Sequence, residues 1–166
     1  ILIPLGEYPP HAHNPFHAMV RIYRTKSKLK PMEIDDVLSL PVMIDPDKML
    51  AMRALSSLTI TAGFGGKILL VLQACIHMIT LTFRHGLAPE SAYAFIGFAM
   101  VNYKVFGDNA VAVKSKSIAT KLFREIHGSS GFVPLLALTD FDMWFQPLLE
   151  VPNIFDNLFE QAMSSG

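Results

Sequence analysis

The sequence predicts an all-α protein in which antiparallel helix pairs stack side by side as an α-solenoid of about six to seven helices. Between Asp45 and Phe123, apolar residues recur at three- and four-residue steps, and glycine or proline turns interrupt them at nearly constant spacing. Segments of about 20 residues in pairs give a repeat of about 40, the period of helical-repeat arrays. No long alternation of apolar and polar residues indicates a strand.

Residues 1–30 are predicted to precede this domain as an extended connector and a basic lead-in. Four prolines within residues 1–16 prevent a regular helix there. Residues 18–30 then form a basic helix or its frayed end, with the cations Arg21, Arg24, Lys26, Lys28 and Lys30. A solvated helix face is the favoured interpretation, and a phosphate-binding patch is the alternative. The helical-repeat domain is predicted to span residues 31–166.

The first helices of this domain have recognisable start and stop signals. A short helix follows Pro31 and ends at Pro41. Asp45 is predicted to be the N-cap of the next helix, with Pro46 at its first position. The glycines of residues 63–66 separate it from a helix that ends at Gly86, which we expect to be a left-handed C-cap.

Two further helices follow, and their pairing can be predicted. Pro89 opens the first, and Asp108, directly after the Gly107 turn, is the expected N-cap of the second. We expect the second helix to pack closely on the first through a seam of mostly small residues, Ala112, Ala119 and Leu122. Residues 132–144 and 147–163 are predicted to add further helical segments, the last one kinked by Pro152.

Composition limits the classes of function. Of the 166 residues, 14 are basic and 14 acidic, so no net field would attract nucleic acid or an anionic membrane. The single cysteine, Cys75, cannot form an internal disulfide, which favours a reducing, cytoplasmic location. Because the chain starts at Ile1 and has no signal peptide, we interpret it as a fragment of a longer polypeptide.

A membrane-associated helical hairpin is an alternative, because residues 68–83 are strongly apolar. Lys67 and Arg84 bound a stretch of 16 residues that contains Gln73 and His77. A transmembrane helix needs about 20 apolar residues. The length therefore argues against membrane insertion and favours a helix buried within the protein.

Two short motifs resemble ligand sites, but neither is complete. Residues 63–67 resemble the end of a phosphate-binding loop, yet Ile68 occupies the position of the hydroxyl residue that would bind magnesium. His11, His13 and His17 lie in or beside a proline-rich segment without the cysteines or carboxylates that would complete a metal site. We therefore expect no bound metal and no cofactor.

The sequence also predicts no catalytic residues. Cys75 and His77 are two residues apart, so their side chains point in different directions around a helix and cannot form a dyad. Exposed aromatic residues could instead form an interaction surface, for which the candidates are Tyr93, Tyr103 and Trp144. Another alternative is a helical bundle that binds a ligand among Tyr93, Phe95, Met100 and Trp144.

Several segments resemble a region of very large signalling proteins. They are LPVMIDPDKMLAMRALSSL (residues 40–58), APESAYAFIGFAMVNYKVFGD (residues 88–108) and IATKLF (residues 118–123). The family consists of AAA-type predicted ATPases fused to a protein-kinase-like domain and to GAF and histidine-kinase modules. Its helical, tetratricopeptide-like region follows the ATPase domain. The glycine-rich residues 63–67 and Pro152 depart from the family pattern.

The resemblance implies a role as a non-catalytic scaffold within such a protein. The segment would couple the upstream ATPase domain to the sensory and output domains downstream, or bind a protein or peptide on its concave face. The kinase and ATPase activities would belong to the parent protein. The resemblance implies no catalytic residue for this segment, because the family's kinase, nucleotide-binding and phosphoacceptor residues lie elsewhere.

Overall fold

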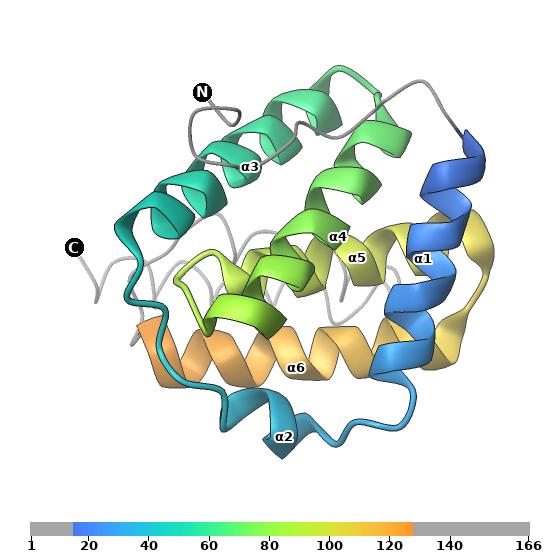
Figure 1. The fold of residues 1–166 in the computed structure, drawn as a ribbon. Coiled ribbons are helices and arrows are strands. Elements are labelled where there is room, and N and C mark those ends of the chain that lie inside the picture. Colours follow the sequence, from blue (N-terminus) through green and yellow to red (C-terminus); the bar gives the residue numbers. More distant parts are fainter. Residues whose placement is uncertain (1–14, 128–166) are drawn as a thin grey trace, which may run out of the picture.

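The computed structural model describes residues 15–127, and this part of the chain forms six α-helices (Figure 1). Apart from these helices, it contains only an isolated parallel bridge between Val42 and Leu87. The all-α class is therefore confirmed for the described residues, and the predicted segments 132–144 and 147–163 lie outside them. The helices are α1 (Pro15–Leu29), α2 (Ile34–Leu38), α3 (Pro46–Phe64), α4 (Ile68–His85), α5 (Ser91–Phe106) and α6 (Asn109–His127).

From α3 to α6, each helix packs against the next one along the chain, and the most extensive contact joins α5 to α6. Two contacts also connect elements that are far apart in sequence. In these, α1 packs against α4, and the short helix α2 packs against α6 (Figure 1). A linear repeat array requires contacts only between neighbouring units. The contacts that α1 makes with α4 and α2 with α6 therefore go beyond the sequential packing that a linear array requires.

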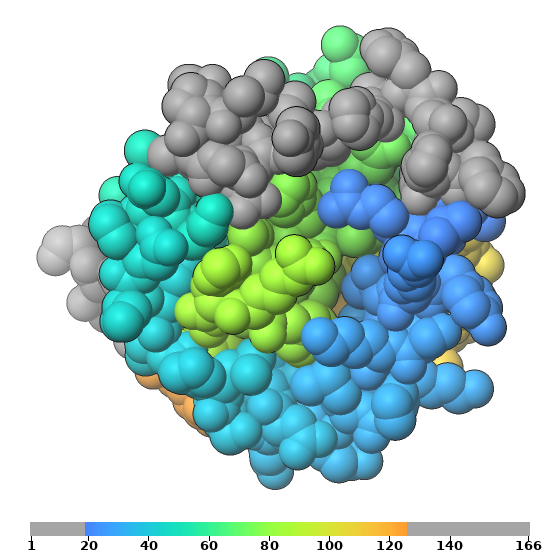
Figure 2. Space-filling view, in the orientation of Figure 1, coloured from blue at the N-terminus to red at the C-terminus, as the bar shows by residue number. Residues whose placement is uncertain are grey.

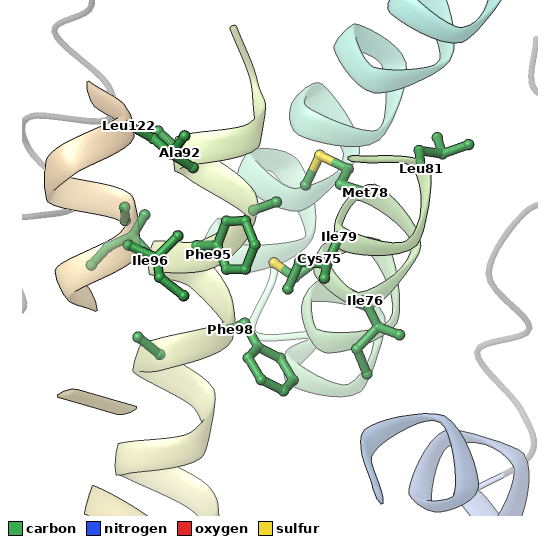
Figure 3. Packing of buried hydrophobic residues seen from close by; sticks show 14 of the residues in the cluster. Cys75, Ile76, Met78, Ile79, Leu81, Ala92, Phe95, Ile96, Phe98 and Leu122 are labelled. Atoms are coloured by element: carbon green, nitrogen blue, oxygen red, sulfur yellow. The ribbon is translucent and has the colours of Figure 1, made fainter. Parts of the chain in front are cut away.

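The centre of the protein is formed by α4 and α5, whose side chains interdigitate in Figure 3. Every residue from 72 to 79 on α4 is buried, as is every residue from 94 to 99 on α5. A helix in contact with neighbours on several sides needs apolar residues around most of its circumference. Contacts with α1, α3 and α5 thus give a structural reason for the strongly apolar sequence of α4.

The basic helix α1 belongs to the same packed unit. Its Ile22 and Leu29 are 3% and 2% exposed and form part of the hydrophobic core. Thr25, between them, is also buried, and its hydroxyl donates to the Arg21 carbonyl oxygen at 2.9 Å. The expected division at residue 30 therefore does not coincide with an edge of the core. The apolar face of α1 is narrow and lies among many cations, so the sequence did not indicate that α1 belongs to the core.

The start of α3 has the geometry expected of an Asp-Pro helix cap. The Asp45 carboxylate accepts hydrogen bonds from the backbone N–H groups of Asp47 and Lys48, at 2.9 and 3.3 Å. Pro46 occupies the first turn, where its missing N–H costs nothing. One face of α3 is then buried through Met52, Leu55 and Ala62.

Gly86 ends α4, but its backbone differs from the left-handed conformation that we expected. Its φ of 100° and ψ of −177° place it in an extended, positive-φ region that essentially only glycine adopts. The difference arises because Leu87 must pair with the loop before α3. The Leu87 N–H donates to the Pro41 carbonyl, and the Met43 N–H donates to the Leu87 carbonyl, both at 2.7 Å. The left-handed C-cap is instead Gly107, with φ 63° and ψ 17°.

A buried hydroxyl network fixes the turn from α4 into α5. The Thr82 hydroxyl lies 3.0 Å from the Met78 carbonyl oxygen and 2.8 Å from the Ser91 hydroxyl. Since its one proton is donated to Met78, Ser91 must be the donor to Thr82. The Ser91 oxygen in turn accepts the Ala88 N–H at 3.0 Å. Buried polar groups that satisfy one another in this way hold the turn in one conformation.

The three residues predicted to form a seam between α5 and α6 are all buried. Ala112, Ala119 and Leu122 are 0%, 1% and 0% exposed. Small side chains at such positions allow two helix axes to approach closely. The contact between α5 and α6 is the most extensive between two helices of the described chain, as close packing of the pair would require.

A second close approach joins α4 to α5 at Gly97. A Cβ atom at Gly97 would lie 2.6 Å from the Cys75 sulfur, which is closer than real Cβ contacts allow. Cys75 itself is fully buried (Figure 3). Glycine is normally unfavourable inside a helix, so its presence here is explained by the space that the sulfur atom takes up.

We expect Gly97→Ala to lower the free energy of unfolding by about 1–3 kcal/mol, because the new methyl group overpacks the contact with Cys75. Cys75→Ala in the same chain should restore part of this loss, since it removes the sulfur atom. Urea unfolding of the two single variants and the double variant measures the coupling, expected at about 0.5–3 kcal/mol. Strictly additive effects would show that the two residues do not compete for space.

Candidate interaction surface

The glycine turn between α3 and α4 has no backbone amides free to hold a phosphate. The N–H groups of Gly65, Gly66 and Lys67 donate to the carbonyl oxygens of Thr61, Gly63 and Ala62, at 3.1, 3.0 and 2.8 Å. A phosphate-binding loop needs such N–H groups to point at its ligand. Residues 63–67 therefore form a helix-to-helix turn that closes the end of α3.

The histidines considered as metal ligands are not brought together by the described structure. His11 and His13 lie outside the described residues, and His17 falls within α1. Within residues 15–127, no group of three or more His, Cys, Asp or Glu residues could hold a metal ion. Histidine ligation of a metal therefore has no support from residues 15–127.

Cys75 is in an environment that suppresses thiol chemistry. Burial raises the pKa of its thiol to about 12, although a hydrogen bond with Thr59 acts in the opposite direction. The thiolate is the reactive form of cysteine, so the Cys75 side chain stays protonated at neutral pH. Within the described structure, Cys75 acts as a small apolar core residue between α4 and α5.

The aromatic residues proposed for ligand or partner binding have different environments. Tyr93 and Tyr103 are half-buried and pack against the core. Burial, with a smaller contribution from Cys75, raises the pKa of Tyr93 to about 12. Phe95 is fully buried and lies edge-on to Phe83, with ring centroids 6.2 Å apart. Trp144 lies outside the described residues.

Met100 is half-buried and packs against the core. Together with the full burial of Phe95, this means that the described members of the suggested ligand pocket are core or core-edge residues. Of the proposed surface residues, Tyr93 and Tyr103 lie within the described chain, and both keep part of their side chains accessible.

Asp108 caps α6 and also pairs with a distant lysine. Its carboxylate accepts the Val111 N–H at 3.3 Å and lies 2.7 Å from Lys26 Nζ on α1. Lys26 also lies over the Phe106 ring, 5.1 Å from its centroid. The sequence near Asp108 offered only Lys104 as a basic neighbour, and this pairing across 82 positions could not be inferred from it.

The electrostatic state of Asp108 follows from these contacts. The hydrogen bond from Lys26 is the largest of the effects that lower the pKa of its carboxyl below the ordinary value of 3.8, and the Val111 N–H adds to it. A lowered pKa in the folded state means that this stabilisation is present above the unfolded-state pKa and disappears as the pH falls through the folded-state value.

We expect Asp108→Ala to cost about 0.5–2 kcal/mol because it removes the helix cap. Asp108→Asn should cost less, since asparagine also caps and an exposed ion pair contributes only about 0–1 kcal/mol. Chemical unfolding at pH 7 and at pH 3 measures both effects, and the Asn variant should lose less stability on acidification than the native chain. If Asn is as damaging as Ala, the charge pair with Lys26 outweighs the cap.

The described surface also exposes several large apolar side chains. Phe64, at the end of α3, is 92% exposed, and Val42 and Ile44, in the loop before α3, are 72% and 89% exposed. Leu50 and Ile68 are about half exposed. Side chains of this kind serve as anchors when they enter a pocket on a partner. The apolar periodicity of α3 did not single out Phe64 as an exposed residue. Phe64 is the last residue of the helix and follows Gly63.

Of the described helices, α4 alone is long and apolar enough to cross a membrane, with a mean hydropathy of 1.4 over 18 residues. Just over half of this window, 56%, is buried inside the protein. A core helix of a soluble protein meets the same criteria of length and composition. This single helix is therefore weak evidence for a membrane span.

The described geometry defines a helical protein with several large apolar side chains exposed on its surface. Comparisons of the chain with protein-family models, with curated proteins and with solved structures find no match.

Proposed function

We propose that the chain is a non-catalytic helical scaffold that binds other domains or proteins. The observation that carries this proposal is the exposure of Phe64, Val42 and Ile44 on the described surface. Within the described residues, the buried apolar side chains form one core, and these three side chains do not take part in it. An interaction partner would bury them and gain the corresponding hydrophobic free energy.

The particular role that we propose follows the family resemblance. The chain would form part of a tetratricopeptide-like stack in the cytoplasm, between an upstream ATPase domain and downstream sensory and kinase domains. The sequential packing from α3 to α6 supports such a stack. The test is the reading frame around this segment. A nucleotide-binding motif upstream together with a GAF or histidine-kinase module downstream is the expected result, and a complete short gene would contradict it.

Neighbouring domains identified in that reading frame provide a binding assay. Phe64→Ala should weaken their binding at least about tenfold if Phe64 is an interface anchor. Val113→Ala, at a half-exposed position on α6, serves as the matched control and should change binding much less. Equal binding by the native chain and the Phe64→Ala variant would exclude Phe64 from the interface.

A non-catalytic role also predicts that the chain does not bind magnesium-ATP tightly. The Gly65, Gly66 and Lys67 amides are already hydrogen-bonded within the turn, and Ile68 provides no hydroxyl for magnesium. Titration calorimetry of the native chain and of Lys67→Ala should therefore give the same absence of tight binding. Binding that is present in the native chain and lost in Lys67→Ala would refute the prediction.

A membrane-associated helical hairpin is the second candidate, and the apolar composition of α4 is the observation that favours it. Sedimentation without detergent distinguishes the two proposals. A scaffold should stay in the supernatant as a folded helical protein, whereas a membrane hairpin should require detergent or lipid to do so.

A further inference from the structure

The charges of this chain are separated along its length. All 14 Lys and Arg residues lie within residues 15–127, together with only eight of the 14 Asp and Glu residues, so this part carries a net charge of +6. Residues 128–166 contain five acids and no Lys or Arg. The acids are Asp140, Asp142, Glu150, Asp156 and Glu160. The zero net charge of the whole chain therefore conceals two parts of opposite sign.

A row of three cations follows one side of α1. Arg21, Arg24 and Lys28 are spaced by three and four residues, so they lie along the same side of the helix. The helix contains no Asp or Glu residue that could neutralise them. In Figure 2, α1 lies at the surface on one side of the displayed face. Arg24 and Lys28 are exposed, and Arg21 is half-buried. We call these three residues the α1 cation row.

The cation row is not neutralised by the described part of the protein. Lys26, which lies outside the row, pairs with Asp108, and Lys28 lies over the Phe83 ring at 4.3 Å from its centroid. No carboxylate among residues 15–127 forms an ion pair with Arg21 or Arg24. Arg21 is half-buried. A partly desolvated guanidinium without a counter-ion favours the approach of an anion.

The covalent connection makes the acidic segment of the same chain available to this row. Lys114 Nζ on α6 donates to the Lys30 carbonyl at 3.0 Å, so the end of α1 lies beside the first half of α6. From Lys114 to His127, the helix rises about 20 Å. An extended chain from His127 to Asp140 spans up to about 45 Å, enough to return over this distance. Tethering also raises the effective concentration of the acidic segment near the row above that of a free partner.

We propose that the acidic segment from Asp140 to Glu160 binds the α1 cation row of the same molecule. Its carboxylates would supply counter-ions for Arg21 and Arg24, which form no ion pair with a carboxylate among residues 15–127. A free polyanion such as nucleic acid is a weaker candidate, because the chain as a whole has no net charge to attract one. The proposal depends on the charge distribution and does not require the scaffold function to be correct.

Zero-length carbodiimide cross-linking of the full chain tests the proposal, because the reagent joins an amine only to a carboxylate in direct contact. An Arg24→Lys substitution adds a reactive amine to the row beside Lys28. Mass spectrometry of the monomeric fraction should find cross-links from Lys28 and from the new lysine to acids between Asp140 and Glu160. About 1 M salt should suppress them, since it shortens the Debye length to about 3 Å.

Two variants make the test specific to the row. Arg21→Gln/Arg24→Gln should reduce the Lys28 cross-links about two- to tenfold, because two ion pairs are lost. Lys67→Gln/Arg124→Gln removes two exposed cations elsewhere and should leave the cross-links unchanged. Circular dichroism verifies that each variant folds, and the single Arg24→Gln variant replaces the double one if the half-buried Arg21 is required for folding.

Trp144 provides a second measurement, since it is the only tryptophan and lies between Asp142 and Glu150. Its accessibility to the neutral quencher acrylamide should increase in Arg21→Gln/Arg24→Gln and remain native in the control variant. The proposal would be overturned if no cross-links to the acidic segment form, if the row variant leaves them unchanged, or if they occur only in dimers. In the last case, the occupant would be the segment of a second copy.

Discussion

Gly86→Ala is expected to destabilise the protein more than alanine at any other described glycine with positive φ. A Cβ atom at this position would lie 2.2 Å from the Pro41 carbonyl oxygen, and φ is 100°. Strain in this backbone region costs about 1–3 kcal/mol, and the steric conflict adds about 1–3 kcal/mol. Because the Pro41 oxygen is also the acceptor for the Leu87 N–H, relieving the clash would break the contact between the loop before α3 and the end of α4.

Two other glycines provide matched controls for this prediction. Gly66 and Gly107 have φ values of 66° and 63°, and a Cβ atom at either position would meet nothing within 4 Å. Alanine there should cost only the backbone strain, about 1–2 kcal/mol. Urea unfolding of the three Ala variants separates strain from collision. Similar losses at all three glycines would show that the loop moves away from Gly86 without cost.

Phe95→Ala is the second large effect that we expect. Phe95 is 0% exposed and packs edge-on against Phe83, so its removal leaves a cavity between α4 and α5. Phenylalanine-to-alanine substitutions in cores cost about 3–5 kcal/mol. The midpoint of urea unfolding should therefore fall sharply, with an unchanged slope if unfolding remains two-state.

Phe64→Ala is the control, because it makes the same chemical change at a side chain that is 92% exposed. Its effect on the free energy of unfolding should lie within about 0.5 kcal/mol. The comparison also tests the alternative of a ligand-binding bundle. If Phe95→Ala has as little effect on stability as Phe64→Ala, the Phe95 ring does not support the core, and a role in binding a ligand would be favoured.

The sequence alone determined the helices and most of their ends. Apolar residues at three- and four-residue steps define the buried faces of α3 and α6, because this spacing matches the helical period. Local capping was also readable, since an N-cap such as Asp45 bonds to N–H groups only two and three residues away. Ala112 and Ala119 were likewise expected to lie on a buried helix face, and both are buried.

Only the tertiary structure decided which distant groups meet. The Lys26–Asp108 pair, the collision that excludes a side chain from Gly86, and the Gly97–Cys75 contact all join different elements of the chain. The packing of α2 on α6 and of α1 on α4 is of the same kind. Helical periodicity specifies which face of a helix is apolar, but it carries no information on which other helix covers that face. Packing of the whole chain makes that choice, and for this reason the core role of α1 and the backbone conformation of Gly86 emerged only with the fold.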